Sequence, residues 1–261
     1  MKILFLGDIV GSSGRRILEA GIPKIREEHK LDLIIANGEN AAHGFGITQQ
    51  ICKEILATGV DIITGGNHTF DKKEWPQTFN EYASKLVRPA NYPAGTIGKG
   101  STVVMGKSGH KIGIINLMGR VFMDPLDCPF QAFNREIESV RRETSIILVD
   151  MHAEVSSEKS AMGYFVDGRV SAIVGTHTHV PTADERILPK GTGFLTDAGM
   201  NGPLDSVIGM KKEIILERFL KKLPIKMEVA EGPGPLSGVI FSIDSDSGRC
   251  VEIERVRKNV L

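Results

Sequence analysis

Five short segments of the sequence place a side chain that can bind a metal directly after an apolar run of strand length. They are Leu6-Gly7-Asp8, Asn37-Gly38-Glu39-Asn40, Gly65-Gly66-Asn67-His68, Val149-Asp150-Met151-His152 and Gly175-Thr176-His177-Thr178-His179. Ligands of α/β proteins bind beyond the carboxyl ends of the sheet strands. We therefore expect one crevice that gathers Asp8, Glu39, Asn40, Asn67, His68, His152, His177 and His179.

Each of these segments, taken alone, also has an ordinary structural explanation. An aspartate such as Asp8 is a common helix cap, and a single histidine such as His152 is more often a hydrogen-bonded structural residue. The pair His177 and His179 is more specific, because residues two apart in an extended segment face the same side and two imidazoles there can chelate a metal. Four of the seven histidines lie at these strand ends, and this conjunction predicts a metal centre.

The types of ligand narrow the choice of metal. Oxygen donors and imidazole nitrogens without a thiolate suit first-row ions such as manganese, iron or zinc. Seven candidate ligands exceed the number that one tetrahedral ion uses, so we expect two ions. Paired ions about 3.5–4 Å apart recur in enzymes that hydrolyse phosphoesters, where they activate a bridging water and neutralise the phosphate oxygens.

The elements that must position these residues alternate between strands and helices in the first part of the chain. Strands are predicted at 3–6, 33–36, 62–64, 112–117, 146–149 and 171–174, and helices at 12–29, 48–58, 131–142, 156–165 and 211–220. Ser12 and Ser13 suit the N-cap of the first helix, Pro23 is expected to kink or divide it, and Thr48 suits the N-cap of the second.

The later chain suggests more antiparallel pairing. A hairpin is predicted over 101–117 with its turn at 107–109, and further strands at 185–188, 193–196, 238–243 and 250–256. We therefore expect an α/β fold over residues 1–261 as a single domain, in which a second, more antiparallel sheet packs on the first half. The apolar side chains of the stretch 211–226 are expected to pack on the body, with the lysines solvated.

Composition excludes several classes of protein. Lys plus Arg equals Asp plus Glu at 32 each, which weakens the case for general nucleic-acid or membrane-surface binding. Cys52, Cys128 and Cys250 are odd in number and form no CxxC pair, so we expect no disulfide framework and a cytoplasmic location. No apolar run reaches the length of a membrane helix. The glycine-rich segment 7–14 has neither the GxGxxG spacing nor the GK[ST] of a nucleotide-binding loop.

At these residues the chain resembles the calcineurin-like metallophosphoesterases. The motifs of that family are GD-x-H, GD, GNH, a lone His and GH-x-H, and here they correspond to Gly7-Asp8, Gly38-Glu39-Asn40, Gly66-Asn67-His68, His152 and His177-Thr178-His179. Val10 stands where the first motif has its histidine, and Glu39-Asn40 replaces the aspartate of the second. Both departures are similar to the bacterial YmdB subfamily, in which the glutamate bridges the metals and the asparagine restores the lost ligand.

The resemblance implies a fold, a site and an activity. The fold is a two-sheet sandwich flanked by helices, and the cofactors are two divalent or mixed-valence first-row ions, iron or manganese before zinc. One metal takes Asp8, Glu39, Asn40 and His179, and the other takes Glu39, Asn67, His152 and His177. His68 protonates the leaving oxygen without ligating. The implied activity is hydrolysis of a cyclic nucleotide, with 2′,3′-cyclic AMP as the expected substrate, through a metal-bridging hydroxide.

Residues outside these motifs carry less specific expectations. Asp150 is either an acceptor for a ligating imidazole or a strand-end cap, and Arg120 is either a phosphate clamp or an ordinary surface arginine. Asp71 is expected to cap a helix near 72–75. Three aromatic residues are candidates for stacking on a base, although core or loop packing is the commoner role: Trp75, Phe122 and Phe130.

Two alternatives to a small-molecule enzyme stay open. The chain is either a metal-containing regulatory protein that acts through a partner, for which the basic stretch 211–226 is a candidate, or a metal-dependent nuclease. Zero net charge disfavours long RNA, whose binding depends on phosphate neutralisation. No membrane partner is expected, and a homo-oligomer is compatible with the sequence.

Overall fold

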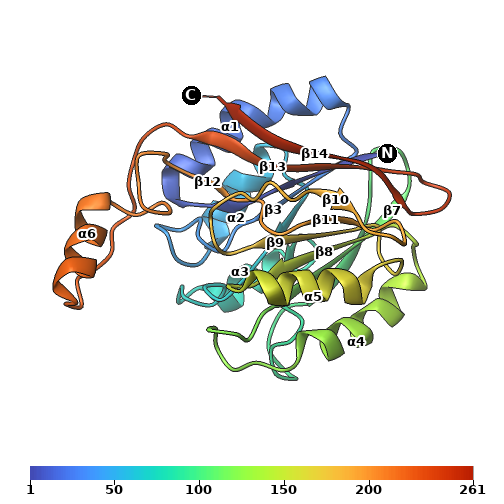
Figure 1. Cartoon of the computed structure of the whole chain (residues 1–261), viewed down its shortest axis with the longest axis horizontal. Helices are drawn as coiled ribbons and strands as arrows, with labels where there is room; N and C mark the ends of the chain where they lie inside the picture. Colours follow the sequence, from blue (N-terminus) through green and yellow to red (C-terminus); the bar gives the residue numbers. More distant parts are fainter. Residues whose placement is uncertain (261) are drawn as a thin grey trace.

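Two β-sheets lie face to face in the computed structural model, which describes residues 1–260, and helices cover both outer sides (Figure 1). The short ribbon formed by β2 (Asp8–Ile9) and β12 (Met200–Asn201) lies beside them. The helix α6 (Lys212–Lys221) projects from the rest of the molecule. The arrangement confirms the predicted two-sheet α/β sandwich.

The first sheet is built around parallel strands from the first part of the chain. Its strands, in spatial order, are β14 (Cys250–Asn259), β13 (Pro235–Ile243), β1 (Lys2–Leu6), β3 (Leu33–Asn37), β4 (Ile62–Thr64) and β5 (Leu86–Val87). The crossovers between its parallel strands contain α1 (Gly11–His29), α2 (Gln49–Ala57) and α3 (Trp75–Glu81). β13 pairs antiparallel with both β1 and β14.

The second sheet has a parallel centre and antiparallel edges. Its strands, in spatial order, are β10 (Arg186–Ile187), β11 (Gly193–Leu195), β9 (Ala172–Thr176), β8 (Ile147–His152), β7 (Lys111–Met118) and β6 (Ser101–Met105). The helices α4 (Pro129–Arg141) and α5 (Ser156–Val166) connect β7 to β8 and β8 to β9. The predicted hairpin of β6 and β7 is confirmed, with Gly109 at a φ of 81° in its turn.

The prediction that the strands now labelled β13 and β14 belong to the second, more antiparallel sheet was wrong. The hairpin of β13 and β14 extends the first sheet beside β1, and the second sheet is mostly parallel. The physical reason is the length of the connections, because a helical crossover returns the chain to the same end of the sheet and makes neighbouring strands parallel.

Alternation along the strands separates the apolar clusters. Ile3 and Phe5 of β1 face the second sheet and are packed with Ile114 of β7 and Leu148 of β8. The intervening residues Leu4 and Leu6 face the opposite side, where they pack with Ile17 and Leu18 of α1. On the outer face of the second sheet, Val149 and Ile173 pack with Phe133 of α4. Burial on both faces fixes the register of the central strands, because a slip by one residue would exchange the two faces.

Helix α1 begins earlier and is more continuous than predicted. Val10 is its N-cap and no side chain caps it, so the expected roles of Ser12 and Ser13 were wrong. Pro23 lies inside a single helix instead of dividing it, because Ile22 and Ile25 on either side of Pro23 are buried and anchor both halves. At α2 the prediction is confirmed, since the Ile51 N–H donates to Thr48 Oγ1 over 3.3 Å.

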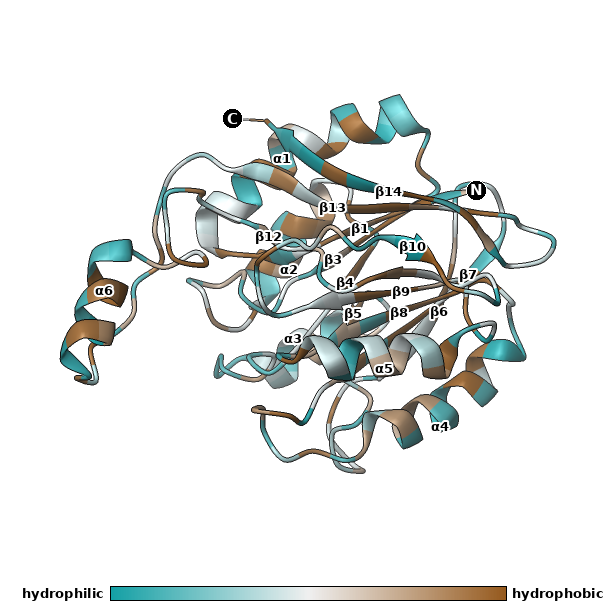
Figure 2. Ribbon diagram, in the orientation of Figure 1, coloured by the Kyte–Doolittle hydropathy of each residue, from teal (hydrophilic) through white to brown (hydrophobic). Residues whose placement is uncertain are grey.

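Helix α6 does not pack on the body as expected. Ile215 is its only buried residue, and Leu216, Phe219 and Leu220 are exposed. Figure 2 shows apolar segments on this projecting helix. Among residues 1–260, no helix is long and apolar enough to cross a membrane.

Candidate metal centre

The predicted ligands follow the carboxyl ends of strands from both sheets. Asp8 lies two residues beyond the end of β1, Glu39 and Asn40 follow β3, and Asn67 follows β4. His152 is the last residue of β8, and His177 follows β9 directly. The parallel registers of β1 with β3 and of β8 with β9 place these ends along one rim of the sandwich.

A first group of donors surrounds His152. Its Nε2 atom lies 3.1 Å from Glu39 Oε1, 2.9 Å from Asn67 Oδ1 and 3.2 Å from His177 Nδ1. One ligand atom each from Glu39, His152 and His177 lies within 4.8 Å of the others, so these three residues could hold a metal ion.

A second group adjoins the first through Glu39. Asn40 Nδ2 lies 3.0 Å from Glu39 Oε1 and 3.1 Å from His179 Nε2, and His179 Nε2 lies 3.8 Å from Asp8 Oδ1. Metal ligation through the oxygen of Asn40 requires its amide group to be turned over. Glu39 therefore lies between two sets of polar side chains.

Two observations test whether a cation fits between these donors. Asp8 is completely buried, and its Oδ1 atom has no hydrogen-bond partner among the described residues. A Cβ atom on Gly66 would lie 2.3 Å from both Glu39 Oε2 and His152 Nε2, so the glycine leaves open the space that these atoms face. Because a buried carboxylate is costly without a counter-charge, the donor set fits a cation.

The ionisation of these groups reflects their mutual charges. Burial raises the pKa of Asp8. Burial also raises the pKa of Glu39, but the charge of His152 outweighs it and lowers the value to about 2. Burial lowers the pKa of His152, but Glu39 and Asp8 outweigh it and raise the value to about 9. The pKa of His177 falls to about 3 through burial and the neighbouring His152.

The His177-Thr178-His179 segment is bent, not extended as the sequence suggested. His177 has a φ of 97° and His179 a φ of 64°, so both occupy the sparsely populated left-handed region. The bend sends His177 to the first group of donors and His179 to the second. Backbone strain of this kind persists only where the surroundings hold it in place.

A buried ion pair provides part of that support. Lys159 Nζ donates to Asp197 Oδ2 over 2.6 Å, and both side chains are almost completely buried. The same oxygen accepts from the backbone N–H and the hydroxyl of Thr178, over 3.2 and 2.7 Å. The central residue of the bent segment is thereby held to α5.

Hydrogen bonds orient the rings of the two histidines in this segment. His177 Nε2 lies 3.0 Å from Glu154 Oε2, and its backbone N–H donates to Asp8 Oδ2 over 3.1 Å. His179 Nδ1 lies 2.8 Å from the carbonyl oxygen of Ile208, to which it can donate. These bonds leave His177 Nδ1 and His179 Nε2 directed at the donor groups.

Asp150 acts on His152 through a threonine. Thr176 Oγ1 donates to Asp150 Oδ1 over 2.7 Å and lies 2.9 Å from His152 Nδ1. Because the Thr176 hydroxyl donates its proton to Asp150, His152 Nδ1 must donate to the Thr176 oxygen. His152 Nε2 is then free to bind a metal. Asp150 thus contacts no imidazole directly, and burial raises its pKa to about 6.

His68 lies beside the donor groups and is oriented by Asp71. Its backbone N–H donates to Glu39 Oε2 over 2.9 Å, and its Nδ1 atom lies 2.7 Å from Asp71 Oδ2. The expected capping role of Asp71 was wrong, because α3 begins at Trp75 with Glu74 at its N-cap. Phe45 contacts the His68 ring edge-on at 4.8 Å.

The remaining candidates make contacts of other kinds. Arg120 is exposed, its backbone N–H donates to Glu158 and its Nη2 atom lies 3.6 Å from Cys128 Sγ. Phe130 packs on Phe165, and Trp75 packs on Phe70. Phe122 is 90% exposed. A phosphate-clamping role for Arg120 stays a prediction.

Val10, which replaces the histidine of the first family motif, is completely buried. A Cβ atom on Gly209 would lie 2.7 Å from the Val10 side chain, and one on Gly202 would lie 3.1 Å from it. Two glycines therefore allow the backbone to close over Val10.

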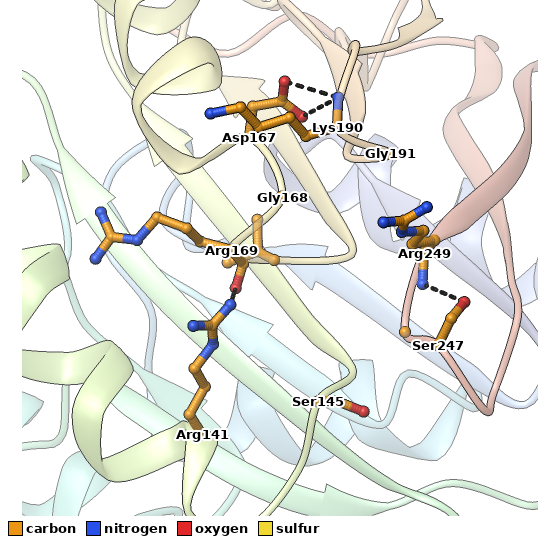
Figure 3. A pocket seen from close by; sticks show the side chains of 11 residues that line it. Arg141, Ser145, Asp167, Gly168, Arg169, Lys190, Gly191, Ser247 and Arg249 are labelled. Atoms are coloured by element: carbon orange, nitrogen blue, oxygen red, sulfur yellow. Dashed lines mark hydrogen bonds between the residues drawn. The ribbon is translucent and has the colours of Figure 1, made fainter.

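A cavity of about 680 Å³ lies at the other end of the second sheet, near the amino ends of β8 and β9 (Figure 3). It is lined by Arg141, Asp167, Lys190 and Arg249, among others, and by none of the predicted site residues. Both oxygens of Asp167 accept from the backbone N–H of Lys190.

The sequence analysis missed the residues that support the ligands. Glu154, Thr176, Lys159 and Asp197 each contact a candidate ligand or the turn that carries it. Lys159 and Glu154 lie in segments without any recognisable motif. Thr176 and Asp197 adjoin motif residues, but a sequence does not show which buried polar group they meet.

Comparisons with known proteins identify the family of this chain. The family model described as YmdB-like protein matches residues 4–256. The chain belongs to the YmdB-like family. It is 50% identical over 259 residues to a 2′,3′-cyclic-nucleotide 2′-phosphodiesterase of Bacillus subtilis, covering 99% of this chain and 97% of that protein. It is 38% identical to a putative phosphatase/phosphodiesterase of Mycoplasma genitalium, covering 98% and 92%.

Solved structures extend the family likeness to the fold. A hypothetical protein from Thermus thermophilus aligns over 100% of both chains with a TM-score of 0.93 and 40% identity. A novel phosphatase from Mycoplasma pneumoniae aligns over 99% of this chain and 94% of that one, with a TM-score of 0.89 and 35% identity. The expectation of a YmdB-like phosphodiesterase enzyme is confirmed.

The buried ion pair yields a stability prediction. Lys159→Met leaves Asp197 as a buried carboxylate without its counter-charge, so the free energy of unfolding is expected to fall by about 3–5 kcal/mol. Urea denaturation of the metal-free protein measures this. The matched control is Lys111→Met, which breaks the exposed pair with Glu143 and is expected to cost less than about 1 kcal/mol. Equal losses in the two variants would contradict the role of Lys159.

The pKa of His152 yields a prediction for metal binding. Because the metal-free value is about 9, His152 is protonated at neutral pH and a metal must displace that proton. Manganese binding is therefore expected to release about one proton from His152 at neutral pH and none well above pH 9, while His177 is already neutral. Calorimetric titration in buffers of different ionisation enthalpy counts the protons. Release that is independent of pH would refute the assignment.

Proposed function

We propose that this chain is a dinuclear-metal phosphodiesterase that hydrolyses 2′,3′-cyclic nucleotides, with 2′,3′-cyclic AMP as a substrate. The position of Glu39 between two sets of donors is the observation that carries the proposal, because a bridging carboxylate is what a pair of ions needs. The name of the Bacillus subtilis relative supports the substrate class.

Asp8, Asn40 and His179 would hold one ion, and Asn67, His152 and His177 would hold the other. Iron and manganese suit these oxygen and nitrogen donors, and zinc is the third candidate. Two bound ions would supply an activated water and positive charge beside the phosphate oxygens.

The chain's own part in bond cleavage is assigned to His68. As water adds to phosphorus and the bond from phosphorus to the ribose 2′ oxygen breaks, that oxygen needs a proton. His68 Nε2 would donate it, because Asp71 Oδ2 lies 2.7 Å from Nδ1 and orients the ring. The product would be a 3′-monophosphate.

The proposal predicts different losses for two variants. His68→Ala is expected to lower turnover by about 10²–10⁴-fold while metal content is kept, since it removes the proton donor. Asp71→Asn keeps the ring but removes the carboxylate that orients it, so it is expected to lose less activity than His68→Ala. Steady-state kinetics and elemental analysis measure both effects. Turnover unchanged in His68→Ala would remove His68 from the mechanism.

The substrate is tested with metal-stripped protein given 2′,3′-cyclic AMP, with and without manganese, while the 2′- and 3′-monophosphates are resolved by chromatography. Turnover that depends on manganese and yields the 3′-monophosphate is expected. Glu39→Gln, which makes the bridging anion a neutral amide, is the control and is expected to lose both metal occupancy and activity. No turnover by protein shown to hold its metals would reject this substrate. Cleavage of single-stranded RNA that falls steeply with salt would favour a nuclease instead.

A further inference from the structure

The cavity of about 680 Å³ in Figure 3 lies where turns from both sheets meet. Three cationic side chains from separate segments line it: Arg141 at the end of α4, Lys190 in the turn between β10 and β11, and Arg249 directly before β14. Strand β8 begins beside the cavity at Ile147 and ends at His152, and its six residues span roughly 17 Å. The cavity is therefore separate from the candidate metal centre.

Two glycines let the cationic side chains lie close against the backbone of the cavity wall. Gly168 has a φ of 76°, and a Cβ atom on it would lie 2.8 Å from Lys190 Cβ. Gly191 has a φ of 97°, and a Cβ atom on it would lie 3.1 Å from Arg249 Cγ and Cδ. The Cys250 N–H also donates to the Gly191 carbonyl over 2.9 Å, which fixes the hairpin of β13 and β14 to this wall. Ordered backbone thus holds the two cations in place.

The positive charge around the cavity is not neutralised by the chain itself. Within residues 1–260, Arg141, Lys190 and Arg249 form no ion pair. The one carboxylate among the described lining residues is Asp167, which is buried and accepts from the backbone N–H groups of Lys190 and Thr192. A concave site lined by charge of one sign attracts ligands of the opposite sign, so the cavity favours an anion.

Arg169 also lines the cavity, but its head group is held elsewhere. Its Nη2 atom donates to Asn134 Oδ1 over 2.8 Å, and its guanidinium lies over the Phe133 ring at 4.7 Å. Figure 3 shows its side chain extending away from Arg249. The Arg169 carbonyl accepts from Arg141 Nη2 over 2.9 Å, which fixes the guanidinium of Arg141 at the wall. Arg169 thus positions Arg141, and three cations are left to meet a ligand.

We propose that this cavity binds a small molecule through a pyrophosphate group, either free or carried by a nucleotide. The guanidinium groups of Arg141 and Arg249 match pairs of phosphate oxygens, and the ammonium group of Lys190 adds a point charge. The volume lies in the range of small-molecule pockets. Three cations confined to one cavity suit a short ligand better than long RNA, whose binding needs positive charge along an extended surface.

Titration calorimetry of the full chain tests the proposal, with inorganic pyrophosphate and ADP as separate probes. It is run on the wild-type protein and on Glu39→Gln, which removes the bridging carboxylate of the proposed metal centre and leaves the cavity unchanged. Each protein is expected to bind one equivalent of probe in the cavity. Adding Lys190→Ala/Arg249→Ala is expected to raise the dissociation constant of that site about tenfold or more in both backgrounds, since two of the three cations are lost. Equal affinity for the two probes identifies free pyrophosphate as the sufficient group, and tighter binding of ADP identifies a nucleotide.

Arg142→Ala is the matched control, because it removes the next cation along the chain, which is exposed and does not line the cavity. It is expected to leave the affinity for both probes unchanged, and circular dichroism checks that every variant is folded. No binding of either probe at millimolar concentration would overturn the proposal. So would an equal loss in Arg142→Ala, which would show only a general attraction of anions. Binding that is present in the wild type but absent from Glu39→Gln would place the ligand at the metal centre and overturn it as well.

Discussion

One buried carboxylate ties the two sheets together at the rim that carries the site. Asp150 lies on β8 of the second sheet. Its Oδ2 atom nevertheless accepts hydrogen bonds from Thr64 and Asn37 of the first sheet, over 2.5 and 3.3 Å. Its Oδ1 atom accepts from Thr176, which in turn fixes the His152 ring. The relative position of the sheets and the orientation of a ligand therefore depend on the same side chain. The ligands from the two sheets can meet only if this junction holds.

Electrostatics then explains why the rim is a place for cations. Asp8 is completely buried and its Oδ1 atom has no hydrogen-bond partner among the described residues, so the energy of its burial is recovered when positive charge lies beside it. The bend at His177 and His179 also favours cation binding, since it directs one imidazole to each of the two donor sets. Strain in the backbone and burial of charge are both costs to folding that a bound ion would offset.

The sequence predicted the parts of the structure that depend on local pattern. Apolar runs located the central strands, Thr48 marked the start of α2, and residues after the strand ends were candidate ligands that the structure brings together at one rim. It could not place β13 beside β1, because strand pairing over more than 200 residues is decided by packing and not by local pattern. It also assumed that α6 covers its apolar face on its own chain, and it gave no sign that Lys159 and Asp197 would meet in the interior.

The burial of Val10 bears on which substitutions the site can accept. Val10 is enclosed by backbone that Gly202 and Gly209 allow to approach closely. A histidine at this position would need space that this backbone occupies, so Val10→His alone cannot add an imidazole at the rim without moving the chain at 202 or 209. Any redesign that introduces the histidine of the first family motif would therefore have to begin with these two glycines.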